Sequence, residues 1–243
     1  MHATQSLVAL ATLASLASAQ VMGFNSGATL DTYKVKTQSD YEAEFTTAQG
    51  LVGAPGKFNS VRLYTMIQGG TDSDPTSAFQ AAIKTNTTML LGIWCSGTTT
   101  IEKELKALNT AITTYGTKFT DLVVGVSVGS EDLYRTSVTG IINKSGIGNS
   151  PDAIVNFIKE TRKAIANTPL SGTPIGHVDT WTDWTNSSNK AVIDAVDFIG
   201  NDLYPYYEDT KDNRVGNSLE LFNEAYNATL AAAGGKPVWI TET

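Results

Sequence analysis

The 243-residue sequence has little cysteine, histidine or basic charge, and each shortage excludes a class of protein. Its single cysteine, Cys95, has no partner for an internal disulfide, so the fold must be stabilised by its core. Lys and Arg total 17 against 24 Asp and Glu, giving a net charge of -7 that would repel phosphate groups. We therefore expect neither a nucleic-acid partner nor binding to an anionic membrane.

The sequence also has few of the motifs that carry histidine, thiol, metal or nucleotide chemistry. Beyond the N-terminal segment the only histidine is His177, and the serine in "GVSVG" (125–129) lies within a run of strand-forming valines, not at the strained turn of a serine hydrolase. Histidine and cysteine are too scarce for a zinc site, and no loop has calcium-ligand spacing. Glycine-rich phosphate-binding motifs are absent. We expect no metal and no cofactor.

Long apolar runs are confined to the N-terminus. Residues 7–16 are apolar and are followed by the small residues "ASA" before Gln20, a pattern typical of a secretory signal peptide over residues 1–19. No later run is long enough to span a bilayer. Four N-x-S/T sequons fit a secreted glycoprotein, at Asn86, Asn143, Asn186 and Asn227.

Short apolar runs alternate with helix-like segments along the rest of the chain. The runs are residues 21–27, 58–65, 89–97, 122–131, 174–181, 195–205 and 236–243. Apolar residues at three- and four-residue spacing predict helices at 41–51, 76–85, 100–119, 150–167 and 218–235, with Ser150 as a helix N-cap and Pro151 following it. Because most runs are continuously apolar, they indicate parallel strands covered on both faces.

This alternation is typical of a (β/α)8 barrel or of a doubly wound sheet. The missing dinucleotide motif argues against the doubly wound sheet. Polar residues end several runs, and a barrel opens all of these ends onto one face, where catalytic residues collect. We predict an α/β fold of the (β/α)8 type, as a single domain over residues 20–243.

Two of the polar residues at strand ends are glutamates, Glu131 and Glu242. Partial burial and a second nearby carboxylate raise the pKa of such a group, so two unequal carboxyls can divide into an acid and a nucleophile. Glycoside hydrolysis needs this division. A glutamate at a strand end is equally an ordinary solvated loop residue, and the residue types alone leave both interpretations open.

The motifs around these glutamates resemble a known family. "VGVSVGSEDLYR" and "PVWITET" are similar to the two catalytic motifs of family 17 glycoside hydrolases, the fungal branch of the β-1,3-glucanases, and "VRLYT" and "FIGNDLYPYY" resemble two further strand segments. The resemblance runs in order over the mature chain. It implies a retaining endo-β-1,3-glucanase of the fungal cell wall or extracellular space, acting on β-1,3-glucan as a monomer, with Glu131 as acid/base and Glu242 as nucleophile.

The resemblance implies further site residues. Arg62 would keep Glu242 ionised, and Tyr204 would donate a hydrogen bond to that nucleophile or to the sugar. Sugar contacts are implied for Asn25, Tyr64, Ser130, Asp202 and Tyr206. Trp181 and Trp184 are candidates either for a sugar platform or for ordinary core packing, and Asp132, beside the acid, is interpreted as structural.

Two features depart from the family pattern. Ser130 stands where related barrel glycosidases carry asparagine, and the sequence stops at Thr243, where relatives continue with a "GWP"-like segment and an eighth β/α unit. We expect a C-terminally incomplete barrel, so that residues 20–243 alone are poorly stable or inactive. Two other functions stay open: a β-1,3-glucanosyltransferase that uses the same glutamates, and a non-catalytic cell-wall glucan-binding protein.

Overall fold

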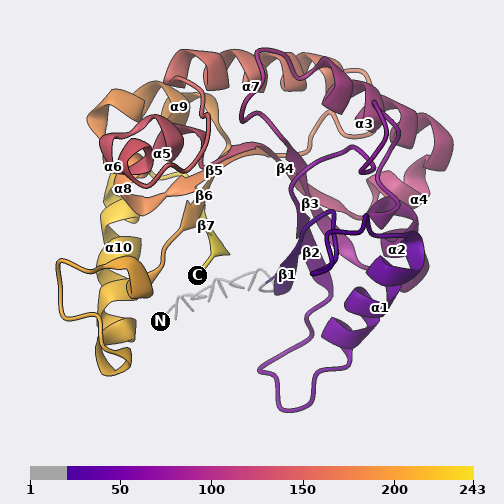
Figure 1. The fold of residues 1–243 in the computed structure, drawn as a ribbon. Helices are drawn as coiled ribbons and strands as arrows, with labels where there is room; N and C mark the ends of the chain where they lie inside the picture. The colour runs from indigo at the N-terminus through magenta and orange to yellow at the C-terminus, as the bar shows by residue number, and fades with distance from the viewer. Residues whose placement is uncertain (1–20) are drawn as a thin grey trace, which may run out of the picture.

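Seven parallel strands form one sheet, in chain order from β1 to β7, that curls into an open barrel (Figure 1). The computed structural model describes residues 21–243, so the predicted signal peptide lies outside the described residues. This arrangement confirms the predicted (β/α)8-type fold with seven units. The strands are Gly23–Ser26 (β1), Ser60–Leu63 (β2), Thr88–Ile93 (β3), Val123–Ser130 (β4), Ile175–Thr180 (β5), Phe198–Asp202 (β6) and Val238–Glu242 (β7).

The helices lie along the convex side of the curved sheet (Figure 1). The α-helices are Gln38–Gln49 (α1), Ala78–Thr85 (α2), Glu102–Tyr115 (α3), Thr117–Thr120 (α4), Asp132–Thr136 (α5), Val138–Ile142 (α6), Pro151–Ile165 (α7), Trp181–Trp184 (α8), Lys190–Ala195 (α9) and Ser218–Ala232 (α10). Three 3-10 turns are Ser187–Asn189 (η1), Pro205–Tyr207 (η2) and Val215–Asn217 (η3). None of the helices within residues 21–243 combines the length and apolar character needed to cross a membrane.

The predicted helices are present, with one interruption. The Ser150 hydroxyl accepts a hydrogen bond from the Ala153 backbone N–H, and Pro151 opens α7, as its capping signal predicts. The helix expected over 100–119 divides into α3 and α4 at Gly116, whose φ of 57° and ψ of -141° break the helix. The short helices α5 and α8 follow strands β4 and β5 directly, and α6 follows α5; none of the three has a periodic signal in the sequence.

Aromatic and aliphatic side chains fill both faces of the sheet. Between sheet and helices, the buried rings of Phe79 and Phe119 pack with centroids 4.7 Å apart. Trp239 of β7 stacks on Phe198 of β6 at 3.8 Å and also reaches β4, where a Cβ on Gly125 would lie 3.1 Å from the indole. This packing links β4 to β7 and fixes the two strands that carry the glutamates.

Strands β1 and β7 are the two edges of the sheet. The Asn25 amide on β1 donates to the Thr241 carbonyl on β7 at 2.9 Å, so a side chain connects the edges where no backbone ladder does within the described residues. Phe24 and Ile240, on these strands, keep 50% and 40% of their surface exposed. The edges therefore meet through a polar contact while apolar surface stays open to solvent.

Candidate active site

The carboxyl ends of β2, β4, β6 and β7 bring most of the predicted site residues together. Glu242 is the last residue of β7, and it pairs in register with Asp202 at the end of β6. Ser130 ends β4, and Glu131 follows it. Because parallel strands end at the same rim of a barrel, residues far apart in sequence meet here.

Glu242 is held by three donors. Its Oε1 accepts from Arg62 Nη1 at 2.5 Å and from the Tyr64 hydroxyl at 2.9 Å, and its Oε2 accepts from the Tyr204 hydroxyl. Burial alone would raise the pKa of Glu242, but the charge of Arg62 and the hydrogen bonds from Tyr204, Arg62 and Tyr64 outweigh it, and the pKa is lowered. Glu242 is therefore held as a carboxylate.

Glu131 sits in a different environment. It occupies the left-handed region at φ 55° and ψ 29°, an uncommon conformation for a residue with a side chain, and it caps α5. Burial raises the pKa of its carboxyl, the charge of Glu242 raises it further, and Arg135, 3.7 Å away, partly opposes both. The two glutamates thus have pKa values shifted in opposite directions.

Arg62 connects the two strands that carry the glutamates. While its Nη1 binds Glu242, its Nη2 donates to the Ser130 hydroxyl at 2.9 Å. Arg62 and Ser130 are both buried. The Ser130 hydroxyl therefore accepts a hydrogen bond from Arg62. It helps to hold the arginine that binds Glu242, and it also lies next to Glu131 in the chain.

A second polar contact joins β7 to β6. The Thr241 hydroxyl donates to Asp202 Oδ1 at 2.7 Å, while Asp202 Oδ2 is buried and has no hydrogen-bond partner within residues 21–243. Burial, followed by the charge of Glu242, raises the pKa of Asp202 well above its ordinary value. Protonation of Asp202 is thus favoured beside the ionised Glu242, because two adjacent buried charges of like sign are disfavoured.

The aromatic candidates separate into different environments. Tyr206 in η2 is 79% exposed and meets the Tyr207 ring edge-on at 5.2 Å, and no hydrogen bond joins its side chain to the glutamates within the described residues. Trp184 is buried, and its indole N–H donates to the Gly200 carbonyl at 2.7 Å, so core packing is the correct interpretation. Trp181 is partly exposed and donates to Glu208 at 2.7 Å.

Arg135 is a site residue that the sequence analysis did not single out. Besides pairing with Glu131, its guanidinium donates to the Ser130 carbonyl and to the Ser96 hydroxyl, and it lies 5.4 Å from the centre of the Trp94 ring. The i, i+4 spacing from Glu131 within "SEDLYR" is the sequence signal that could have identified it. Asp132 is fully buried and accepts from Ser96, as a structural residue does.

The reactive groups at this rim are the carboxyl groups of Glu131 and Glu242, in the part of the chain that the structure describes. No group of three or more histidine, cysteine, aspartate or glutamate side chains there is arranged to hold a metal ion. A lowered-pKa carboxylate and a raised-pKa carboxyl at one rim are suited to nucleophilic attack and proton donation, respectively.

The chain is similar to known fungal proteins over nearly its whole length. The chain is 54% identical to a probable glucan endo-1,3-beta-glucosidase of Aspergillus oryzae, over 98% of this chain and 51% of that protein. It is 25% identical to a glucan 1,3-beta-glucosidase of Saccharomyces cerevisiae, over 91% of this chain and 66% of that protein. The chain spans about half the length of the Aspergillus relatives it matches.

Solved structures share the fold. A glycoside hydrolase family 17 beta-1,3-glucanosyltransferase from Rhizomucor miehei superposes with a TM-score of 0.68 at 21% identity, over 90% of this chain and 70% of that one. An endo-laminarinase from Formosa superposes with a TM-score of 0.63 at 13% identity, over 91% and 65% of the two chains. The BtgE/BtgC glycoside hydrolase domain matches residues 23–243. The chain therefore belongs to the family of the BtgE/BtgC glycoside hydrolase domain, of the family 17 type that its two glutamate motifs predict.

Proposed function

We propose that the chain cleaves β-1,3-glucan at internal linkages with retention of anomeric configuration. The observation that carries the proposal is the opposite shift of two pKa values at one barrel rim, upward for Glu131 and downward for Glu242. The Aspergillus relatives named probable glucan endo-1,3-beta-glucosidases support the choice of substrate.

In the first half of the reaction, a Glu242 oxygen attacks the anomeric carbon and forms a glycosyl ester. The bond from that carbon to the leaving oxygen breaks, and Glu131 gives its proton to this oxygen. Arg62 and the two tyrosines that hold Glu242 orient its carboxylate for attack. Glu131 is suited to proton donation because burial favours its protonated form.

In the second half, Glu131 is a carboxylate and accepts a proton from water. The resulting hydroxide oxygen attacks the anomeric carbon and displaces Glu242, which restores both glutamates to their starting states. The raised pKa of Glu131 serves both halves, because a carboxyl group that is a weaker acid is also a stronger base once it has given up its proton.

The experiment is to trap the glycosyl ester with a 2-fluoro-laminaribiosyl fluoride and locate the label by peptide mass spectrometry. Labelling of Glu242, and its loss in Glu242→Gln, is the expected result. Proton NMR of the first product from reduced laminarin oligosaccharides reports the configuration. Label on another residue, or no label on a chain that unfolds cooperatively, would contradict the proposal.

The same trapping experiment separates the competing functions. A glucanosyltransferase would form the same ester on Glu242 but release longer oligosaccharides, because a second glucan replaces water. A non-catalytic glucan-binding protein would form no ester, and Glu242→Gln would leave glucan retention unchanged. The three donors that hold Glu242 ionised favour a catalytic role over binding alone.

We further propose that the protein is a secreted, monomeric cell-wall glycoprotein with a cleaved signal peptide at 1–19. The N-terminal sequence pattern supports export, and the asparagines of all four sequons are exposed, at Asn86, Asn143, Asn186 and Asn227. Expression in a fungal host tests this. An N-terminus at Gln20, a mass loss on deglycosylation and a monomeric mass by light scattering are expected, and an intact N-terminus would contradict the export.

A further inference from the structure

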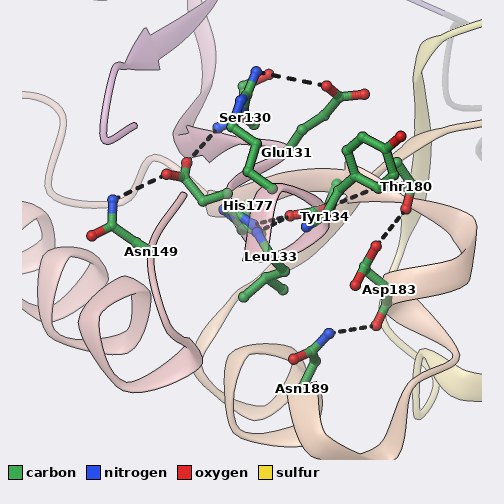
Figure 2. A network of polar contacts seen from close by, with 12 residues as sticks. Ser130, Glu131, Leu133, Tyr134, Asn149, His177, Thr180, Asp183 and Asn189 are labelled. Atoms are coloured by element: carbon green, nitrogen blue, oxygen red, sulfur yellow. Dashed lines mark hydrogen bonds and ion pairs between the residues drawn. The ribbon is translucent and has the colours of Figure 1, made fainter. Parts of the chain in front are cut away.

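A buried histidine and aspartate lie beneath the turn that carries Glu131, and the proposed reaction gives them no role. His177 and Asp179 are on β5, and both side chains are fully buried. Figure 2 shows His177 among the side chains around the turn of Glu131. His177 Nδ1 lies 2.6 Å from the Val128 carbonyl, and its Nε2 lies 2.9 Å from Asp179 Oδ2. Both ring nitrogens therefore face oxygen atoms.

Asp179 is surrounded by hydrogen-bond donors. Its two oxygens accept backbone N–H groups from Leu133 at 2.8 Å, Tyr134 at 3.1 Å and Thr180 at 2.9 Å, in addition to the imidazole. A carboxyl group that accepts several backbone N–H bonds is stabilised as the carboxylate. Asp179 is thus an acceptor only, and His177 Nε2 is the donor in their contact.

The contact of the other ring nitrogen, Nδ1, shows that His177 is positively charged. A backbone carbonyl only accepts, so Nδ1 also carries a proton toward Val128. An imidazole that donates from both nitrogens is an imidazolium. Burial alone would lower the pKa of His177, but the hydrogen bond to Asp179 and the charge of Asp179 outweigh it, and the pKa is raised.

The ion pair holds the Glu131 turn from both sides. On the β4 side, Gly129 has a φ of 84°, and a Cβ built there would lie 2.9 Å from the His177 ring. The backbone at Gly129 therefore packs directly against the imidazole. On the α5 side, Asp179 receives the first N–H groups of the helix that Glu131 caps. Glu131 N–H itself donates to the Val178 carbonyl, between the two partners, at 2.8 Å.

Other charged groups face the pair from each neighbouring element. Asp132 of α5 and Asp183 of α8 both act on its charges, and Arg135 of α5 pairs with Glu131. The Trp184 ring closes the pocket edge-on at 5.6 Å from His177. The surroundings are otherwise acidic, so the imidazolium is the cation that offsets Asp179 there.

We propose that His177 is a positioning residue, a buried imidazolium that fixes the Glu131 turn and offsets the Asp179 charge so that Glu131 releases its proton in the working pH range. This role rests on the proposed function of Glu131 as proton donor. The Asp179 charge raises the pKa of Glu131, so loss of the compensating cation raises it further.

The first test reads the charge of His177 without any activity. The chain from residue 21 onward contains His177 as its only histidine, so ¹⁵N-histidine labelling gives a single ring to follow. We expect both ring nitrogens to stay protonated across pH 5–8. A titration step near the ordinary histidine value of 6.5, or a neutral ring at neutral pH, would overturn the proposal whether or not the chain hydrolyses glucan.

The second test reads the effect on Glu131. In His177→Gln, the basic limb of the pH profile of kcat/KM is expected to move upward by about 0.5–1 pH unit, while the acidic limb set by Glu242 stays in place. The double variant His177→Gln with Asp179→Asn removes both charges and should return the basic limb toward its original position. A packing role alone would lower stability, leave both limbs in place and give no such return.

If the proposed hydrolysis fails, carboxyl ¹³C titration of Glu131 replaces the activity profile in the same variants. An upward shift of the Glu131 pKa in the single variant and its reversal in the double variant are then expected. An unchanged Glu131 titration overturns the coupling. If the variants do not fold, the ring titration of the unmodified chain decides the proposal.

Discussion

Glu131 and Glu242 carry the same carboxyl group, yet their neighbours shift the two pKa values in opposite directions. Glu242 has a cation and two phenols on its oxygens, whereas Glu131 is buried with one cation at 3.7 Å. Both groups are partly buried, with side chains 17% and 25% exposed for Glu242 and Glu131, so the difference arises from the charge of Arg62 and from the hydrogen bonds that Glu242 accepts. Single substitutions among these neighbours should therefore move one titration more than the other.

Arg62→Met tests the cation on Glu242. Its removal should raise the pKa of Glu242 and move the acidic limb of kcat/KM upward by about 1–2 pH units, because an adjacent opposite charge lowers a carboxyl pKa by about that amount. The maximum of kcat/KM should fall roughly 10²-fold as the carboxylate loses its orientation. Arg62 also lowers the pKa of Glu131, so a smaller upward move of the basic limb accompanies it.

The matched control is Arg162→Met, which breaks an exposed pair with Asp197 at the amino ends of β5 and β6, opposite the carboxyl ends that carry the glutamates. Its pH profile should match that of the parent chain, since exposed pairs contribute little. An acidic limb that stays in place in Arg62→Met would show that Arg62 does not set the Glu242 ionisation.

Asp202→Asn tests the raised pKa of this buried carboxyl group. The pKa of Asp202 is raised in the folded chain, so the folded state holds a proton that the unfolded state loses as pH rises through about 3.8, and stability falls above that pH. Asparagine keeps an oxygen for Thr241 without this titration. Denaturant unfolding at pH 5 and pH 8 should show a smaller loss of stability with pH in the variant, and equal losses would contradict the assignment.

At the scale of elements, the turn from β4 to α5 determines where Glu131 points. Gly129 has a φ of 84°, and a Cβ there would lie 2.6 Å from Asp132 Oδ2 as well as against His177. Gly129→Ala should cost about 3 kcal/mol of unfolding free energy, from backbone strain and overpacking together. Thermal and denaturant unfolding measure this loss.

Gly97→Ala separates the two contributions. Gly97 has a φ of 75°, but nothing lies within 4 Å of a Cβ built there. We expect a loss of about 1 kcal/mol from the backbone conformation alone. Equal losses in the two variants would mean that the crowding at His177 has no energetic effect.

The sequence predicts elements whose signals are local. The capping residue and the apolar spacing of helix α7 both lie in its own segment of the sequence, and the strands are indicated by apolar runs. Helices α5 and α8 are too short to show periodicity. Helix α5 begins where Asp179, on the next strand, accepts its first N–H groups, and that contact becomes visible only when the sheet is assembled.

The site residues likewise include some that the sequence indicates locally and others that only the fold brings together. Glu131 and Glu242 stand out because a carboxyl group ends an apolar run, and the family motifs assign them roles. The contribution of His177 depends on two strands meeting at one ring, which no spacing in the sequence encodes. Trp184 is the opposite case, a candidate for sugar binding in the sequence that is a core residue in the structure. Its indole N–H donates to a carbonyl on β6.

At the scale of the whole molecule, the curved sheet has two unpaired edges within the described residues, and stability depends on what joins them. Exposed Phe24 and Ile240 on these strands leave apolar area in water, which reduces the hydrophobic stabilisation of residues 21–243. We expect the isolated polypeptide to have a free energy of unfolding near the low end of the usual range, about 5 kcal/mol, and a correspondingly weak activity.

Asn25→Ala tests the contact between the edges. The Asn25 amide donates to the Thr241 carbonyl next to Glu242, so its loss should lower the unfolding free energy by about 1 kcal/mol and loosen the strand end that carries this glutamate. Asn59→Ala is the control, because Asn59 is exposed beside β2 and its side chain makes no hydrogen bond to the described residues. If Asn25→Ala and Asn59→Ala unfold at the same denaturant concentration, the edges are not coupled through this amide. A larger fall in activity than in stability for Asn25→Ala alone would instead place the effect at Glu242, because the amide then holds the nucleophile's strand more than it holds the fold.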